Sequence, residues 1–193
     1  MIFKKIMVAG LFLMPFSISA KVLVIGDSLA YPIAVSFKKV MPTDGYFLES
    51  TGLNEQLSLN WNDYINELDL SNYSNVIISL GANDGITKNE IDNYQKKAVN
   101  VIKIIQAGND GALVTWVLPP VLKDSKKENA VSHVRGALNL ACNASGIACF
   151  DPSMVIGSEF AMSVNGIPVR TKDGIHYTSQ GADLIVNELL GIK

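Results

Sequence analysis

The chain has 193 residues, of which 48% are hydrophobic and 18% are charged, with a formal net charge of −2 at pH 7. This composition is typical of an ordered globular protein and excludes a disordered chain, and the length predicts one domain with one sizeable core. Beyond the first twenty residues, no run of basic residues is longer than a lysine pair such as those at 96–97 and 126–127. Nucleic acid is therefore not an expected partner, because phosphate binding needs a concentrated positive patch.

The first twenty residues have the layout of a secretory signal peptide. A basic pair precedes a mostly apolar stretch at 6–16, and small residues follow up to Ala20. The apolar stretch is too short to span a membrane, which needs about 20 residues. We expect 1–20 to be a signal peptide and 21–193 to be the mature domain, periplasmic or secreted, without stable membrane insertion. The alternative is a retained N-terminal anchor. Cleavage leaves 14 basic against 18 acidic residues, a net charge of −4.

Short apolar runs and helical stripes alternate along the rest of the chain. Strands are predicted at 21–26, 46–50, 75–81, 112–118 and 147–150. Helices are predicted at 30–40, after a capping box at 87–90, across 131–141 and after Thr178. The stretch 152–172 has no clear period and is predicted to be a long loop with room for a hairpin. The alternation predicts a three-layer α/β domain whose five-stranded parallel sheet is covered on both faces.

Two cysteines, Cys142 and Cys149, lie at the predicted end of one helix and the start of the next strand. An exported chain can keep a disulfide, and this spacing lets a bond pin the helix end to the strand. Two buried thiols fit the sequence nearly as well, because only geometry separates the two cases.

Three polar clusters lie at the ends of predicted elements. An Asp-Ser pair at 27–28 follows the first strand, an Asn-Asp pair at 83–84 follows the third, and Asp-Gly-Ile-His at 173–176 precedes the last helix. In a parallel α/β sheet, ligands bind at the carboxyl ends of the strands. The clusters are therefore candidates for a functional site.

Ser28 is the candidate nucleophile, because a strand-to-helix turn exposes its hydroxyl and aims backbone N–H groups at an incoming anion. A serine hydroxyl needs a neighbouring base, and the chain has two histidines, His133 and His176. The spacing lets Asp173 reach one imidazole nitrogen of His176 while the other nitrogen faces Ser28. His133 lies within a predicted helix, off its apolar stripe, and is expected to be a solvated surface residue.

Four segments resemble the sequence blocks of the SGNH (GDSL) hydrolases. Gly-Asp-Ser-Leu at 26–29, Gly-Ala-Asn-Asp at 81–84 and Asp-Gly-Ile-His at 173–176 are similar to three of these blocks. Ser-Thr-Gly-Leu at 50–53 is a fair match to the glycine block, for which Gly45 is a second candidate. The matches extend over nearly the whole chain after the leader. The resemblance implies a flavodoxin-like SGNH hydrolase fold.

The resemblance also implies a role for each matched position. Ser28 would attack an ester carbonyl, His176 would act as general base and then general acid, and Asp173 would orient His176. The backbone N–H groups of Ser28 and Gly52, with the side-chain amide of Asn83, would form the oxyanion hole. Three such donors suit the charge that develops in a tetrahedral intermediate. No metal or organic cofactor is expected, because the serine carries the acyl group.

Other polar and aromatic residues allow more than one interpretation. Asp27 and Asp84 are expected to brace loops rather than react. Trp116 and Tyr177 fit sugar-stacking platforms, although buried packing is favoured for Trp116. Arg170 fits either a residue that steers an anionic substrate or a surface side chain without a partner.

A second similarity is to a bacterial, often periplasmic, SGNH subgroup linked to acyl groups on cell-envelope sugars. It is carried by the segments 50–53, 116–120 and 173–178. We predict a serine esterase that hydrolyses or transfers a short acyl group, acetyl above all, on an envelope carbohydrate; its partner is a small acyl ester or an acylated glycan. One alternative is a lipid esterase on the same site, which the loops at 54–62 and 152–170 would decide. Another is a non-catalytic carbohydrate-binding or assembly protein.

Overall fold

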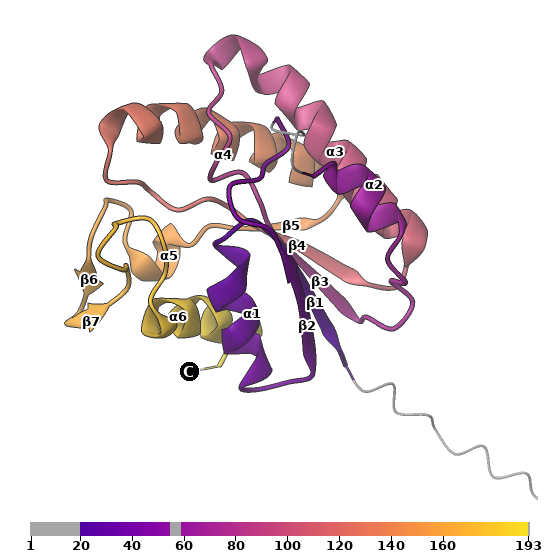
Figure 1. Cartoon of the computed structure of the whole chain (residues 1–193), viewed down its shortest axis with the longest axis horizontal. Coiled ribbons are helices and arrows are strands. Elements are labelled where there is room, and N and C mark those ends of the chain that lie inside the picture. The colour runs from indigo at the N-terminus through magenta and orange to yellow at the C-terminus, as the bar shows by residue number, and fades with distance from the viewer. Residues whose placement is uncertain (1–19, 55–58, 193) are drawn as a thin grey trace, which may run out of the picture.

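The computed structural model describes residues 20–54 and 59–192, so most of the predicted signal peptide lies outside the described residues. Five parallel strands form a sheet in the order β2-β1-β3-β4-β5 (Figure 1). The strands are β1 (Val22–Gly26), β2 (Thr43–Phe47), β3 (Asn75–Ser79), β4 (Leu113–Val117) and β5 (Ala148–Phe150). The predicted five-stranded parallel sheet of an α/β domain is therefore confirmed.

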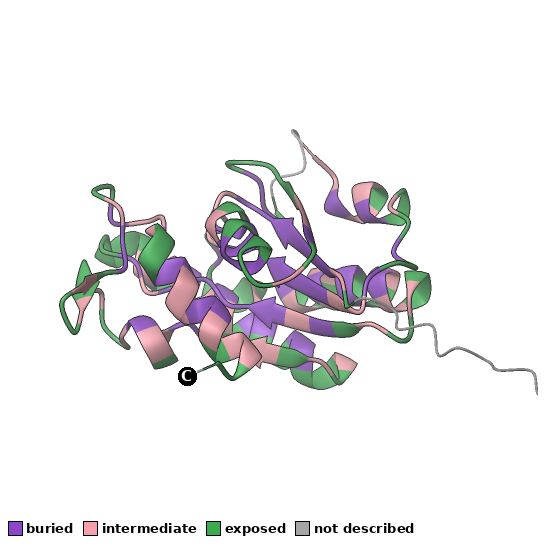
Figure 2. Ribbon diagram, turned by 90° about the horizontal axis from the view of Figure 1, so that it is seen from below, coloured by how far each residue is buried: buried purple, intermediate pink, exposed green. Residues whose placement is uncertain are grey.

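Helices cover both faces of the sheet, which gives three layers (Figure 1). One face packs against α2 (Trp61–Asn66), α3 (Ile91–Gly108) and α4 (Ser125–Ser145). The other packs against α1 (Ala30–Lys38), α5 (Ser153–Ile156) and α6 (Ser179–Leu190). All five residues of β1 are buried, because side chains that alternate along a central strand enter both cores. Figure 2 shows that buried residues predominate along the strands in the middle of the sheet.

The second strand begins and ends earlier than the sequence predicts. It covers 43–47 rather than 46–50, and pairs with β1 from Val22↔Thr43 to Gly26↔Phe47. β2 is an edge strand in which only Thr43 is buried, so backbone pairing and not an apolar run determines its position. The sequence pattern also does not indicate helix α2. The loop predicted at 152–172 contains α5 and a small hairpin, β6 (Ser163–Val164) with β7 (Ile167–Pro168).

The predicted helix starts follow local hydrogen-bonding rules. Thr87 and Glu90 form the expected capping box at η1 (Lys88–Glu90), a 3₁₀ turn that leads into α3. The Thr178 hydroxyl accepts a hydrogen bond from the Gly181 N–H and caps α6, as predicted. Pro32 lies in the first turn of α1, where its missing N–H costs nothing.

A disulfide joins Cys142 and Cys149, which the sequence left open, and their Cα atoms lie 5.9 Å apart. The bond connects the last turns of α4 to β5 at the edge of the sheet. It holds the short β5 strand against the helix that precedes it. Across 20–54 and 59–192, no helix is both long enough and apolar enough to cross a bilayer.

Candidate active site

Tight packing at the carboxyl ends of β1 and β3 positions the first polar cluster. Gly26 ends β1 with φ +154°, and a Cβ there would lie 1.9 Å from the carbonyl oxygen of Ser79 in β3. Only glycine allows this approach. The chain then turns into α1 at Ala30, and Ser28 lies half-buried in the turn. The hydroxyl is therefore presented at the rim of the sheet.

Ser28, His176 and Asp173 form one hydrogen-bonded chain. The Nε2 atom of His176 lies 2.9 Å from the Ser28 hydroxyl oxygen, and its Nδ1 atom lies 2.8 Å from Asp173 Oδ2. With the imidazole proton on Nδ1, the ring donates to Asp173 and Nε2 accepts from the hydroxyl. The fold thus brings together residues 148 positions apart, in the arrangement that activates a serine.

The Asp173 carboxylate is anchored on both oxygens. Its Oδ1 atom accepts hydrogen bonds from the Thr171 hydroxyl at 2.7 Å, the Ile175 N–H at 2.8 Å and the His176 N–H at 3.1 Å. Partial burial raises the pKa of Asp173, but the hydrogen bonds from His176, Ile175 and Thr171 outweigh it and hold the pKa well below its usual value. Asp173 therefore stays ionised at neutral pH and fixes the orientation of the imidazole.

The predicted oxyanion donors lie on three loops, after β1, β2 and β3, and the loops after β2 and β3 contact each other. The Asn83 side-chain amide donates to the Thr51 carbonyl at 3.0 Å, beside Gly52, which leaves its second N–H for a ligand. Among the described residues, the N–H groups of Ser28 and Gly52 have no hydrogen-bond acceptor. Gly45 instead lies inside β2, opposite Val24. Gly52 is therefore the glycine that lies near Asn83.

Asp27 connects the two loops that carry Ser28 and Asn83. Its carboxylate accepts from the Leu29 N–H at 2.9 Å and from the Ala82 N–H at 3.3 Å. Burial raises the pKa of Asp27 to about 7, against the lowering effect of these hydrogen bonds. The carboxylate is 1% exposed, so it braces the loops and does not face a substrate, as expected.

Asp84 braces the glycine loop in the same way. It accepts hydrogen bonds from the Leu53 N–H at 2.7 Å, the Asn54 N–H at 3.0 Å and the Tyr94 hydroxyl at 2.6 Å. A Cβ on Gly52 would lie 2.2 Å from Asp84 Oδ1. Any larger residue at 52 would therefore push the loop away from this anchor.

Two polar side chains differ from the sequence expectation. Arg170 is 5% exposed and donates to the Ile175 carbonyl at 3.2 Å, with its guanidinium 4.8 Å from the centre of the Tyr177 ring. It therefore braces the segment that carries His176, and is neither a surface residue nor a substrate-steering residue. His133 is half-buried, and its Nδ1 lies 3.1 Å from the Ile86 carbonyl, so it is not simply solvated.

The two predicted aromatic candidates are both buried. Trp116 is fully buried and donates to the Leu80 carbonyl at 3.1 Å, which confirms the packing interpretation. Tyr177 is 4% exposed, so the sugar-platform interpretation is wrong for this residue. The exposed aromatic pair near the nucleophile is Tyr31 with Phe47, whose ring centroids lie 5.0 Å apart. The sequence carries no periodic signal for this pair, because its members come from α1 and β2.

A cavity of about 480 Å³ opens beside the Ser28 hydroxyl. Its apolar wall is formed by Tyr31, Pro32 and Val35 of α1, while His176 lines it next to Ser28. The cavity can therefore hold the acyl part of an ester next to the nucleophile. Within 20–54 and 59–192, no group of three or more His, Cys, Asp or Glu side chains is arranged to hold a metal ion.

Comparisons with solved structures find the same fold at low sequence identity. A G-D-S-L family lipolytic protein from Desulfitobacterium hafniense has a TM-score of 0.69 at 15% identity, with 90% of this chain and 99% of that chain covered. A lipase/acylhydrolase from Enterococcus faecalis has a TM-score of 0.61 at 15% identity, with 89% and 96% covered. The fold of the SGNH (GDSL) hydrolases, which the sequence blocks imply, is thereby confirmed.

A third structure is described as a peptidoglycan O-acetylesterase. Its TM-score is 0.61 at 16% identity, and the match covers 78% of this chain but 45% of that longer chain. No curated protein matches the chain in sequence. A family model described as "Protein of unknown function (DUF459)" matches residues 21–191.

Proposed function

This chain belongs to the DUF459 family, which is SGNH-like, and we propose that it is a serine esterase. The observation that carries the proposal is the hydrogen-bonded chain from Ser28 through His176 to Asp173, at 2.9 and 2.8 Å. A serine that is hydrogen-bonded to an oriented imidazole is activated for attack on a carbonyl. The intact set of side chains argues against a non-catalytic binding or assembly protein.

In the proposed mechanism, the Ser28 hydroxyl proton passes to His176 Nε2 as Oγ attacks the ester carbonyl. The backbone N–H groups of Ser28 and Gly52 and the amide of Asn83 stabilise the oxyanion. The protonated His176 then gives its proton to the departing alcohol, which leaves an acyl-serine. Water, deprotonated by His176, releases the acid and restores the serine. A sugar hydroxyl in place of water would make the same site an O-acyltransferase.

The proposed substrate is a short acyl ester, above all an acetyl group, on an envelope carbohydrate. The exposed ring pair of Tyr31 and Phe47 supports a carbohydrate substrate, because sugar rings stack on exposed aromatic faces and Tyr31 lines the same cavity as Ser28. The description of one structural neighbour as a peptidoglycan O-acetylesterase supports the acetyl group. A periplasmic or secreted location fits this substrate and the predicted signal peptide at 1–20.

A panel of esters tests the substrate. We expect the purified protein to hydrolyse p-nitrophenyl acetate with a kcat/KM at least about tenfold above that of p-nitrophenyl octanoate, because the cavity gives a long chain no deep enclosure. We also expect release of acetate from O-acetylated peptidoglycan or polysaccharide, measured enzymatically. A preference for octanoate and for lysophospholipid would instead support a lipid esterase, for which the exposed Val35 in the cavity wall offers an apolar contact.

A further inference from the structure

A second cavity, of about 400 Å³, shares no lining residue with the cavity beside Ser28. It nevertheless adjoins the same site, because Asn83 and Ile175 line it. Asn83 is the proposed side-chain donor to the oxyanion, and Ile175 lies between Asp173 and His176. An ester bound at Ser28 can therefore extend one of its two parts into this second cavity.

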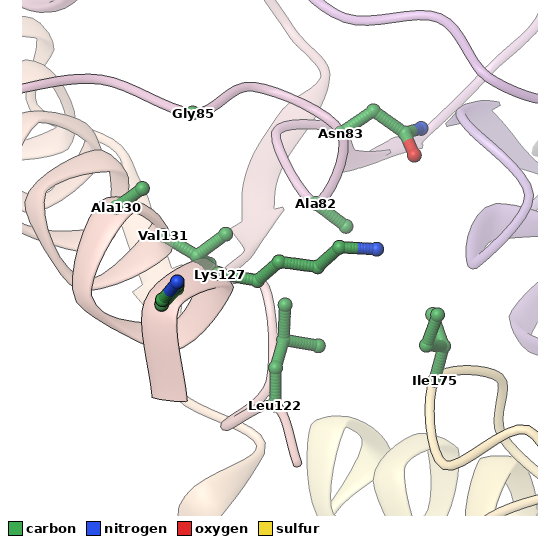
Figure 3. A pocket seen from close by; sticks show the side chains of 9 residues that line it. Ala82, Asn83, Gly85, Leu122, Lys127, Ala130, Val131 and Ile175 are labelled. Carbon is green, nitrogen blue, oxygen red and sulfur yellow. The ribbon is translucent and has the colours of Figure 1, made fainter. Parts of the chain in front are cut away.

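The second cavity carries positive charge and no carboxylate. Lys126 and Lys127 line it from the first turn of α4, and Lys127 extends across it with the ammonium directed toward the space between Asn83 and Ile175 (Figure 3). Lys123 and Lys127 also line an adjoining hollow of about 400 Å³, together with Asp124 and Asp173. Three lysines thus line the two hollows on this side of the proposed active site.

No carboxylate of the described residues is paired directly with these lysines. Among the described residues, the ammonium groups of Lys123, Lys126 and Lys127 form no ion pair and no hydrogen bond. Two acids lie close to them in sequence: Asp124 caps α4 by accepting from the N–H groups of Lys126 and Lys127, and Glu128 forms an ion pair with Arg135. Asp173 is held by His176 and its own loop.

A concave surface with one sign of charge concentrates ligands of the opposite sign. The proposed acyl group is small and uncharged, so the negative charge must lie on the alcohol part of the ester. We propose that the second cavity, which Lys126 and Lys127 line, binds a carboxylate or phosphate on that alcohol part. This proposal rests on the proposed esterase function. The substrate class is then an acylated anionic polymer or head group, rather than a neutral glycan.

Matched pairs of esters test this proposal and separate the two sources of charge. The carboxylate pair is O-acetylated polygalacturonate against O-acetylated xylan, and the phosphate pair is acetylated glycerol phosphate against glycerol monoacetate. We expect kcat/KM to favour the anionic member of at least one pair by about tenfold or more at low salt, and the preference to fall as NaCl is raised. Equal kcat/KM for both members of both pairs would overturn the proposal.

Substitution of the lysines locates the effect. In a Lys126→Met, Lys127→Met double variant, we expect the anionic-to-neutral ratio of kcat/KM to fall about tenfold. The control is Lys96→Met with Lys103→Met, a pair that lines a separate hollow on α3 and should leave the ratio unchanged. An unchanged ratio in the Lys126/Lys127 variant would overturn the proposal. Failure of the wild type to hydrolyse even p-nitrophenyl acetate would instead reject the esterase function.

Discussion

Replacing Ser28 with Ala abolishes hydrolysis of p-nitrophenyl acetate, with an expected loss in kcat of about 10⁶-fold. The reason is that the Ser28 hydroxyl, 2.9 Å from His176 Nε2, is the group that accepts the acyl chain in the proposed mechanism. The residual rate comes from oxyanion binding alone. Initial rates of nitrophenol release at saturating substrate measure the effect.

The Ser28→Ala result is informative only in a folded protein. Ser28 is half-buried in a turn, and loss of its hydroxyl leaves Asp27 and its backbone hydrogen bonds in place. We therefore expect a thermal unfolding midpoint close to that of the wild type. Ser71→Ala, an exposed serine in a different loop, is the matched control and should keep full activity. Wild-type activity in folded Ser28→Ala would reject the nucleophile.

Replacing His176 with Ala produces a loss of the same size, about 10⁶-fold in kcat, because the serine then has no base. Residues that act as one unit are not additive. We therefore expect the Ser28→Ala, His176→Ala double variant to lose no more than either single variant. Independent, multiplicative losses in the double variant would contradict a shared role for the two side chains.

Because His176 is the proposed base, we expect activity to fall at acid pH. Protonated His176 cannot accept the serine proton, so kcat/KM should decrease tenfold per pH unit on the acid side of a profile from pH 5 to 8. Asp173 does not cause this decrease, because its pKa is held well below its usual value and it remains ionised. A flat profile over this range would exclude His176 as the base.

Asp27 requires a control in this profile, because burial raises its pKa to about 7. Between pH of about 4 and 7 the carboxyl is ionised in the unfolded chain but still protonated in the folded protein. The contribution of Asp27 to the free energy of unfolding therefore decreases as the pH rises through this range. In Asp27→Asn this titration is absent. We expect the acid limb of kcat/KM to persist in Asp27→Asn, since it belongs to His176.

The sequence predicted those parts of the molecule that depend on local chemistry. The buried strands β1 and β3 carry continuous apolar runs, and the polar residues that follow them were therefore placed at one edge of the sheet. The three-residue separation of Asp173 and His176 predicted the hydrogen bond between their side chains. The β2 strand was misplaced because an edge strand needs no apolar run, and its position depends on pairing with β1.

The sequence pattern does not predict features that depend on tertiary contacts. Arg170 is buried, has no carboxylate partner in the part of the chain that the structure describes, and donates to the backbone carbonyls of Ile175 and Val121, which no local pattern indicates. The exposed ring pair of Tyr31 and Phe47 is formed between a helix and a strand, so no single side-chain periodicity indicates it. The lysines of the second cavity look like an ordinary solvated pair at 126–127 until the fold places them beside Asn83.

Covalent labelling tests the central claim most directly. A fluorophosphonate reacts with a serine only when a neighbouring base activates the hydroxyl. After incubation of the purified protein with such a reagent, peptide mass spectrometry should find one adduct, on Ser28, and no adduct in the folded His176→Ala variant. An unmodified Ser28, or an adduct confined to another serine of the folded wild type, would contradict the account.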